Sequence, residues 1–232
     1  MSSELERLEN EMRSRGFSRR TVSSYIFHVS QFLEKVSTAS TEEELQRYFI
    51  NLSERLDPRT VNLRISAVKF YYKEVLGKEL RINYMKKPKR LPEVLTKEEV
   101  IRLINSVSNV KHRLLVETIY GCGLRVSEAA KLRKEDLRFE EGLVFIRQGK
   151  GRKDRVISLP KTLSPRLKAY LGSRDDANPY VFDSLRGGHV TVSTIQKIVE
   201  HASNEAGIPK RVHVHTLRHS YATHLLEQGT DL

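Results

Sequence analysis

Several residue types and motifs are rare or absent in this sequence of 232 residues, and each absence narrows its possible functions. Cysteine occurs once, which excludes a disulfide framework within the chain. No apolar run approaches the length of a membrane span, and the polar first residues, MSSE, do not resemble a signal peptide. We therefore expect a cytoplasmic protein without a membrane partner. The motif Gly-x-x-x-x-Gly-Lys-Ser/Thr is also missing, which argues against ATP-driven chemistry.

Acidic residues are too few to balance the basic ones. Lysine and arginine number 41 against 29 aspartates and glutamates, which gives a net charge of +12 and a pI near 9.8. This charge predicts a polyanionic partner, and nucleic acid fits better than a membrane. The alternative is a basic surface that takes no part in function. The length and a hydrophobic content of 38% are sufficient for two packed domains.

Residues 1–80 carry the pattern of a helical bundle. Apolar residues recur at helical spacing, with no β-type run between them. Ser18, the capping box that begins at Thr41, and Asp57 ahead of a proline each mark the start of a helix. Helices joined by short loops pack as a compact bundle, so we predict a helical N-terminal domain.

A basic segment at residues 81–95 is predicted to link this domain to the next. Its first twelve residues hold five basic and no acidic side chains, and two prolines there block helix continuation. In isolation such a run is as often a solvated stretch as a binding segment. If both flanking domains bind DNA, the linker has to cross the duplex, and phosphate contact becomes the better interpretation. The expected DNA contacts of the linker are Lys86, Lys87, Lys89 and Arg90.

Residues 96–232 are predicted to form a second domain that is rich in helices. A capping box at Thr96 begins it. Two β-type runs, 143–146 and 156–159, flank a glycine-rich basic turn at 148–154, which is typical of a β-hairpin. The predicted fold class is therefore mainly α, with an N-terminal helical bundle and an α-rich second domain that contains a small antiparallel hairpin.

Three separated motifs hold the residues with the clearest chemistry. They are a Gly-x-Gly-Leu-Arg run ending at Arg125, a Gly-Lys-Gly turn around Lys150, and His-Thr-Leu-Arg-His at residues 215–219. Attack on a phosphodiester places negative charge on its non-bridging oxygens, which guanidinium groups match bidentately without losing their own charge. A lysine can then protonate the leaving alkoxide. Together these residues suit phosphoryl transfer without a metal.

Each of these residues also has a simpler interpretation. Arg125, at or near a helix start, could be a surface arginine paired with Glu128 three residues later. Charge alone cannot select Lys150 among the basic residues of its turn, and a lone histidine is usually structural. The histidines within residues 213–219 lack a cysteine or carboxylate to complete a zinc site, so no metal and no cofactor is expected.

The order of the three motifs resembles the tyrosine recombinase (lambda integrase) family. The residues that carry the resemblance are GLRVSE at 123–128, GKG at 149–151 and HTLRHSYATHLL at 215–226, and they look most similar to the Xer recombinases of bacteria and archaea. The resemblance implies a SAM-like core-binding domain followed by a catalytic domain, which hold duplex DNA between them. It also implies a site-specific recombinase that cuts and rejoins DNA through a 3′-phosphotyrosyl intermediate.

The resemblance further implies partners and residue roles. Double-stranded DNA with a specific recombination site would be bound by a tetramer of this chain, or together with a paralogous recombinase, and Xer proteins resolve chromosome dimers. Arg125 and Arg218 would clamp the scissile phosphate, and Lys150 would protonate the 5′ oxygen. His215 would assist proton transfer at the nucleophile or stabilise the transition state, and Glu128 would hold Arg125 in place. The further DNA contacts expected in the turn are Arg152 and Lys153.

One departure from the family pattern concerns the nucleophile. In the family a second His or Trp and the nucleophilic Tyr follow the His-Arg helix by a few tens of residues, and this sequence stops at Leu232 before either. Thr230 begins a helix-start signal with no helix after it, so we expect a truncated chain that binds DNA without cleaving it. Tyr221 lies within an apolar stripe one helical turn after Arg218, and we interpret it as a packing residue.

Two other functions remain open. A type IB topoisomerase uses a similar set of arginine, lysine, histidine and tyrosine, although the small helical N-terminal domain favours a recombinase. The other is a naturally truncated relative that occupies DNA sites without cutting them. Strand exchange between two marked sites would distinguish a recombinase from a topoisomerase.

Overall fold

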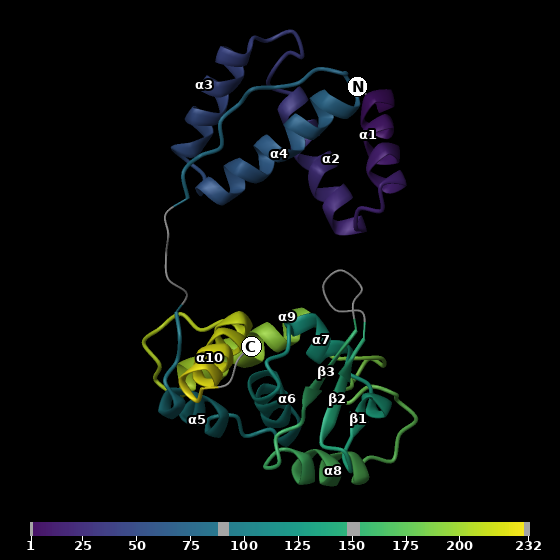
Figure 1. Cartoon of the computed structure of the whole chain (residues 1–232), viewed down its shortest axis with the longest axis vertical. Helices are drawn as coiled ribbons and strands as arrows, with labels where there is room; N and C mark the ends of the chain where they lie inside the picture. Colours follow the sequence, from purple (N-terminus) through teal and green to yellow (C-terminus); the bar gives the residue numbers. More distant parts are fainter. Residues whose placement is uncertain (1, 88–92, 148–153, 230–232) are drawn as a thin grey trace. The chain divides into compact units, whose positions relative to one another are not determined.

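The computed structural model describes residues 2–87, 93–147 and 154–229. The chain forms two compact units, Met1–Arg90 and Leu91–Leu232 (Figure 1). Helices dominate both units. The strands β1, β2 and β3 of the described residues form one small antiparallel sheet in the second unit. The fold class predicted from the sequence is confirmed.

Helices of the first unit begin where the sequence marks their starts. The Ser18 hydroxyl accepts a hydrogen bond from the backbone of Thr21. Thr41 and Glu44 form the expected reciprocal capping box, and Asp57 caps the helix that starts with a proline. These caps satisfy N–H groups that have no partner inside the helix. The four helices are α1 (Ser2–Ser14), α2 (Arg19–Leu33), α3 (Glu42–Ser53) and α4 (Pro58–Glu74).

The core of the first unit combines aromatic and aliphatic side chains from all four helices. Phe32 of α2 lies parallel to Phe49 of α3 with ring centroids 6.3 Å apart, and the ring of Tyr72 from α4 meets Phe32 edge-on at 6.2 Å. Such aromatic pairs bury large apolar areas and fix how the helices pack. Buried aliphatic positions recur at helical spacing, as the sequence pattern predicts. Examples are Leu8, Met12, Val22, Val29, Leu45, Val61, Ile65 and Val68.

The chain after α4 stays on the first unit over several residues. Leu80 and Ile82 are buried in its core. Backbone N–H groups of alternate residues donate to polar side chains of α3 and α4, which thereby take the place of a neighbouring strand. The three pairs are Arg81 N to Glu42 Oε1 at 2.6 Å, Asn83 N to Gln46 Oε1 at 2.9 Å, and Met85 N to Asn62 Oδ1 at 2.7 Å.

This extended segment changes the interpretation of residues 81–95, which the sequence predicts to be a linker. Residues 81–85 are fixed to α3 and α4, so the part of the chain that can link the units starts later. The sequence could not show this, because the side chains that hold the segment lie up to 39 positions away. Lys86 and Lys87, which come directly after the segment, are exposed.

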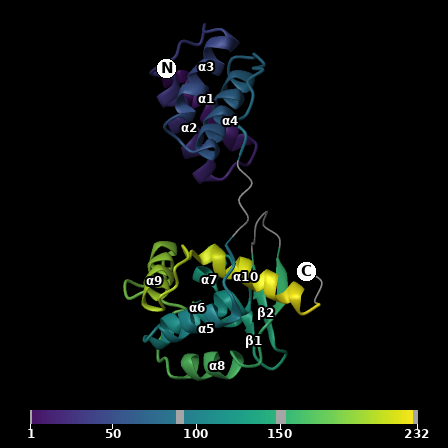
Figure 2. The ribbon, with the colours of Figure 1, turned by 90° about the vertical axis from the view of Figure 1, so that its left-hand side faces the viewer.

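Helix α6 lies at the centre of the second unit, where it packs against α5, α7, α8 and α10 (Figures 1 and 2). Its residues Leu114, Leu115, Val116 and Ile119 are buried. The Thr96 capping box forms as predicted at the start of α5. No helix in the described part of the chain is long and apolar enough to cross a membrane. The helices are α5 (Lys97–Asn105), α6 (Val110–Gly121), α7 (Val126–Lys131), α8 (Ser164–Gly172), α9 (Val192–Glu205) and α10 (Val214–Glu227).

The predicted β-hairpin is present. β2 (Leu143–Ile146) pairs antiparallel with β3 (Arg155–Ser158), in a register that sets Ile146 opposite Arg155. β3 starts and ends one residue earlier than the sequence pattern indicates. A third strand, β1 (Leu137–Arg138), pairs with β2 after a 3₁₀ turn, η1 (Lys134–Asp136). The sequence does not reveal β1, because two residues are too few to show an alternating pattern.

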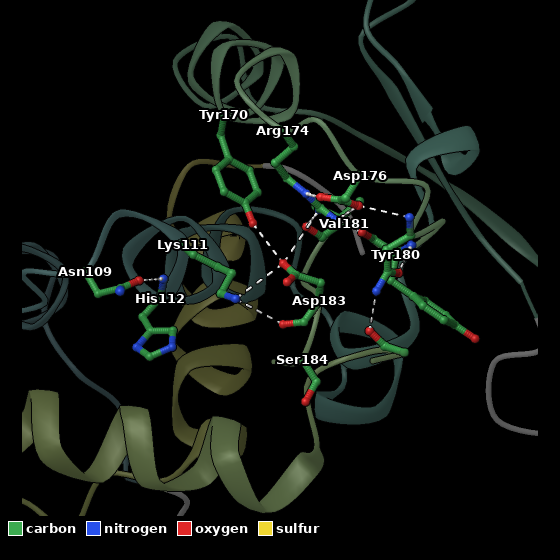
Figure 3. A network of polar contacts seen from close by, with 12 residues as sticks. Asn109, Lys111, His112, Tyr170, Arg174, Asp176, Tyr180, Val181, Asp183 and Ser184 are labelled. Carbon is green, nitrogen blue, oxygen red and sulfur yellow. Dashed lines mark hydrogen bonds and ion pairs between the residues drawn. The ribbon is translucent and has the colours of Figure 1, made fainter. Parts of the chain in front are cut away.

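A polar network fixes the segment between α8 and α9 (Figure 3). Arg174 binds Asp176 through two hydrogen bonds of 2.7 Å, and its side chain is only 8% exposed. Asp183 contacts the ammonium group of Lys111 from α6 at 3.3 Å and accepts a hydrogen bond of 3.4 Å from the Tyr170 hydroxyl of α8. The charges of this network are paired with one another, so its role is to support the fold.

Candidate active site

The turn between α6 and α7 brings the first motif against α10. Gly123 in this turn has a φ of 56°, in the region that favours glycine. A Cβ at this position would lie 2.4 Å from the ring of Tyr221 on α10, so the backbone can approach the ring only because the residue is glycine. The turn and α10 are therefore held in direct contact.

Arg125 follows this turn as the N-cap residue of α7, in agreement with the helix start expected there. Its Nη1 donates a hydrogen bond of 2.7 Å to Glu128 Oε1, and its backbone N–H donates one of 2.8 Å to Glu128 Oε2. The contact expected between these two residues is present. Because Glu128 accepts the backbone N–H, the carboxylate itself serves as the anion at this helix start.

Arg155 joins the same carboxylate from β3. Its Nη1 and Nη2 donate hydrogen bonds of 2.8 and 2.7 Å to the two oxygens of Glu128. This is the bidentate geometry in which a guanidinium pairs most strongly with a carboxylate. The Glu128 side chain is 5% exposed, whereas those of Arg125 and Arg155 are 33% and 31% exposed. One buried carboxylate therefore holds two arginine side chains that are each about one-third exposed.

The surroundings of Glu128 keep it ionised. Burial would raise its pKa, but hydrogen bonds from Arg155 and Arg125 outweigh burial and lower the pKa from 4.5 to about 2. Glu128 therefore carries a negative charge at all physiological pH values. It has no proton to donate near neutral pH.

Arg218 approaches this cluster from α10. Its Nη1 hydrogen-bonds the backbone oxygen of Gly123, two residues before Arg125. Burial lowers the pKa of Arg218, and the positive charge of Arg125 lowers it further, with a smaller contribution from Arg155. An arginine stays charged despite such a shift, so the cluster holds three guanidinium groups and one carboxylate, with two of the guanidinium groups bound to that carboxylate. The excess positive charge is suited to binding an anion.

His215 and the neighbouring histidines occupy different environments. His215 is exposed in the first turn of α10, three residues before Arg218 and hence on a similar side of the helix. His219 is exposed, whereas His224 is buried and its Nδ1 lies 2.8 Å from the Tyr120 hydroxyl. Among the described residues, no group of three or more His, Cys, Asp or Glu side chains could hold a metal ion.

Tyr221 is half-buried in the second unit. Its ring meets that of Tyr120 edge-on, with centroids 6.4 Å apart, and lies against Gly123. Burial raises the pKa of its hydroxyl, which disfavours the phenolate that attack on phosphorus requires. These contacts agree with the packing role that the sequence suggests for Tyr221.

Some of the predicted site residues lie outside the described residues. Lys86 and Lys87 are exposed on the first unit. Arg125, Glu128 and Arg218 come together in the second unit as described above. The predicted residues outside the described ranges are Lys89, Arg90, Lys150, Arg152 and Lys153.

Arg155 is the residue of this cluster that the sequence does not single out. In the sequence it is one of several basic residues near the Gly-Lys-Gly turn, where a phosphate contact is the natural interpretation. Its partner Glu128 is 27 residues earlier, and only the fold brings them together. The sequence holds one weak signal for this role. Side chains alternate between the two faces of a strand, so Arg155 and Val156 of β3 point to opposite faces of the sheet.

Models of known protein families match both units. Residues 93–232 match the Phage integrase family, and residues 5–82 match the N-terminal SAM-like domain of phage integrases. The chain therefore belongs to the phage integrase family of tyrosine recombinases.

Xer-type recombinases are among the individual relatives. Tyrosine recombinase XerA of Pyrococcus furiosus is 39% identical over 236 residues, which cover 98% of this chain and 82% of the relative. A crystal structure of XerA recombinase matches with 32% identity and a TM-score of 0.57, over 99% of this chain and 86% of that one. The crystal structure of a lambda integrase tetramer bound to a Holliday junction is similar to this chain in fold alone. The identity is 17% and the TM-score is 0.80, over 99% of this chain and 74% of that one.

Proposed function

We propose that the full-length protein is a site-specific recombinase that cuts and rejoins duplex DNA, with Arg125 and Arg218 as the clamp on the scissile phosphate. The observation that carries this proposal is a cluster in which Arg125 and Arg155 bind the carboxylate of Glu128, while Arg218 binds the backbone oxygen of Gly123 close enough for the charges of the other three groups to shift its pKa. One carboxylate offsets one of the three positive charges. The remaining charge suits a phosphodiester whose oxygens gain negative charge during attack.

The proposed reaction divides the work among a tyrosine, Lys150 and His215, while Arg125 and Arg218 hold the phosphate. A tyrosine oxygen attacks phosphorus, the bond to the 5′ oxygen breaks, and a 3′-phosphotyrosyl link forms. Lys150 gives a proton to the departing 5′ oxygen, and His215 assists at the attacking oxygen or stabilises the transition state. The free 5′-hydroxyl of a partner strand then attacks the link and restores a phosphodiester. Since the bond energy is kept in the covalent intermediate, no ATP is needed.

None of the tyrosines in residues 1–232 is assigned the nucleophile role. Tyr221 is the one closest in sequence to Arg218, and its packing against Gly123 and Tyr120 argues against it. Arg218, in contrast, has its guanidinium beside the turn that leads to Arg125. The arginine clamp is thus supported by geometry, while the nucleophile is left unassigned.

DNA binding is proposed to involve both units. In the first unit, Lys86 and Lys87 are exposed directly after the segment fixed to α3 and α4, where they can reach phosphates. Contacts from Lys89, Arg90, Arg152 and Lys153 are proposed from the sequence. We propose action as a tetramer on two synapsed sites, alone or with a paralogous recombinase, and a role in resolving chromosome or plasmid dimers, on the ground of the similarity to Xer-type enzymes.

The test is strand exchange by the full-length protein. The target site is first selected from random duplexes that the protein binds, and two copies are placed in one supercoiled plasmid. We expect products in which the segment between the copies is excised or inverted. Relaxation of a plasmid that lacks the site would favour a type IB topoisomerase instead, and binding without any cleavage would favour a DNA-binding relative.

A further inference from the structure

The carboxylate of Glu128 is shared unequally by its two arginines. Arg155 donates one hydrogen bond to each oxygen, in a parallel pair. Arg125 is left with a single side-chain contact, from Nη1 to Oε1, and no second contact of its guanidinium is seen within the described residues. Because Arg155 fills one edge of the carboxylate, Arg125 cannot turn its own fork onto that edge. As far as the described residues show, its other N–H groups can bind an anion.

Arg155 is itself held firmly in place. Its backbone is opposite Ile146 in the β2–β3 ladder, so its Cα position is set by strand pairing. Arg147, the residue directly after β2, forms an ion pair with Asp136, in which its Nε lies 2.7 Å from Oδ1. Asp136 belongs to η1, a few residues after α7. The hairpin is therefore tied to the α7–η1 segment by two arginine–carboxylate pairs.

We infer that Arg155 is a positioning residue for the recombination reaction, which acts through Glu128 to set the orientation of the Arg125 guanidinium. This inference rests on the proposed function of Arg125 as a phosphate clamp. Arg155 touches Glu128, and its contribution to the reaction is to keep the Arg125 fork directed at the phosphate. A bidentate clamp loses much of its effect when its orientation shifts, because the reacting atoms tolerate little displacement.

Substitutions at position 155 can separate the effect of its positive charge from the effect of its guanidinium geometry. Arg155→Lys keeps the positive charge but cannot form the parallel pair with Glu128. Arg155→Gln loses both. If Arg155 acted only by attracting DNA, lysine would replace it, whereas a positioning role requires the fork itself.

A matched control is available in the network of Figure 3. Arg174 also binds a carboxylate, Asp176, through two hydrogen bonds of 2.7 Å, and it makes no contact with Arg125, Glu128 or Arg155 in the described structure. Its side chain is 8% exposed against 31% for Arg155, so Arg174→Lys should destabilise the unit at least as much as Arg155→Lys. Loss of activity through instability alone would therefore appear in the control.

The experiment has two readouts on the same variants. The first is single-turnover cleavage of a suicide substrate by the full-length protein, with DNA affinity and melting temperature measured in parallel. We expect Arg155→Lys and Arg155→Gln to cleave about 10-fold or more slowly than wild type, with DNA affinity within about twofold, because the loss falls on the transition state. The control should cleave at the wild-type rate. The second readout is the NMR resonance of the Arg125 Nε–H group, which should move in both Arg155 variants and stay in place in Arg174→Lys.

The outcomes distinguish a positioning role of Arg155 from an effect on stability and from a failure of the proposed function. Wild-type cleavage by Arg155→Lys, or an unmoved Arg125 resonance in that variant, overturns the positioning role while the proposed function stands. Equal losses in Arg155→Lys and Arg174→Lys overturn it too, because stability would then explain both. If the wild-type protein itself fails to cleave, the proposed function is contradicted, and the resonance alone decides whether Arg155 orients Arg125.

Discussion

The ring of Tyr221 lies where a side chain on Gly123 would have to be, 2.4 Å from the position of its Cβ. This contact brings α10 against the turn that precedes Arg125. It also places the backbone oxygen of Gly123 within reach of Arg218, whose Nη1 binds it. The placement of the two arginines relative to each other therefore depends on the absence of a side chain at position 123.

Gly123→Ala should destabilise the second unit by about 2–4 kcal/mol. About 1 kcal/mol comes from the positive φ, and the remainder from the displacement of the Tyr221 ring. Since the chain has no tryptophan, denaturant unfolding is best followed by far-UV circular dichroism. Gly142→Ala is the matched control, because Gly142 has a φ of 65° and nothing within 4 Å of its Cβ position. Equal losses in the two variants would show that the contact with Tyr221 contributes nothing.

Local signals in the sequence were sufficient for most of the helices. Ser18, Thr41, Asp57 and Thr96 each cap a helix in the structure as the sequence predicts, because a cap depends only on residues within one turn. The β-hairpin can also be predicted from local sequence, because two apolar runs flank a glycine-rich turn. The contact between Arg125 and Glu128 can be predicted as well, because the two residues are only three positions apart.

Contacts between distant residues could not be found in this way. The pair Arg155 and Glu128 depends on β3 meeting α7, and the pair Asn62 and Met85 depends on the chain folding back along α4. Spacing in the sequence carries no information about either. For that reason the sequence predicts the cluster members Arg125, Glu128 and Arg218 but leaves Arg155 among the basic residues of the turn.

Acid unfolding should report the Glu128 ion pairs. The pKa of Glu128 is lowered from 4.5 to about 2 in the folded protein, so its pairing stabilises the fold above pH 4.5 and the stabilisation is lost as the pH falls toward 2. The shift corresponds to about 3 kcal/mol. Glu128→Gln should flatten the decline in unfolding free energy between pH 4.5 and 2, measured by denaturant titration at each pH. Glu140→Gln, at a side chain that is 88% exposed, should leave the decline as in wild type.

The affinity for duplex DNA should fall steeply with salt. Each phosphate contact that is removed should reduce the slope of log K against log salt by about 0.9. Replacing Lys86 and Lys87 by alanine should lower that slope and weaken binding to all sequences alike, and adding Lys89→Ala and Arg90→Ala should deepen the effect. The charge-preserving pair Lys86→Arg and Lys87→Arg should keep the wild-type slope. An alanine variant with an unchanged slope would remove these lysines from the DNA contacts.

A substrate with a bridging sulfur at the 5′ position tests Lys150 as the general acid. A thiolate leaves without a proton, so Lys150→Ala in the full-length protein should cleave this substrate at close to the wild-type rate while it remains slow on normal DNA. Lys153→Ala, at a residue expected only to touch phosphate, should show the same relative rate on both substrates. Lys150→Ala that is equally impaired on both would assign the proton to another group.

Covalent trapping on a nicked suicide substrate tests the arginine clamp most directly. The full-length protein is incubated with its cognate site and denatured in detergent, and the protein–DNA adduct is measured on a gel. Arg125→Lys and Arg218→Lys should each lower the rate of adduct formation about 100-fold or more while they keep most of the DNA affinity, because an ammonium group cannot reproduce the bidentate contact at the transition state. Tyr221→Phe should form the adduct as wild type does. An adduct that forms at the wild-type rate in the arginine variants, or that disappears in Tyr221→Phe, would contradict the site described here.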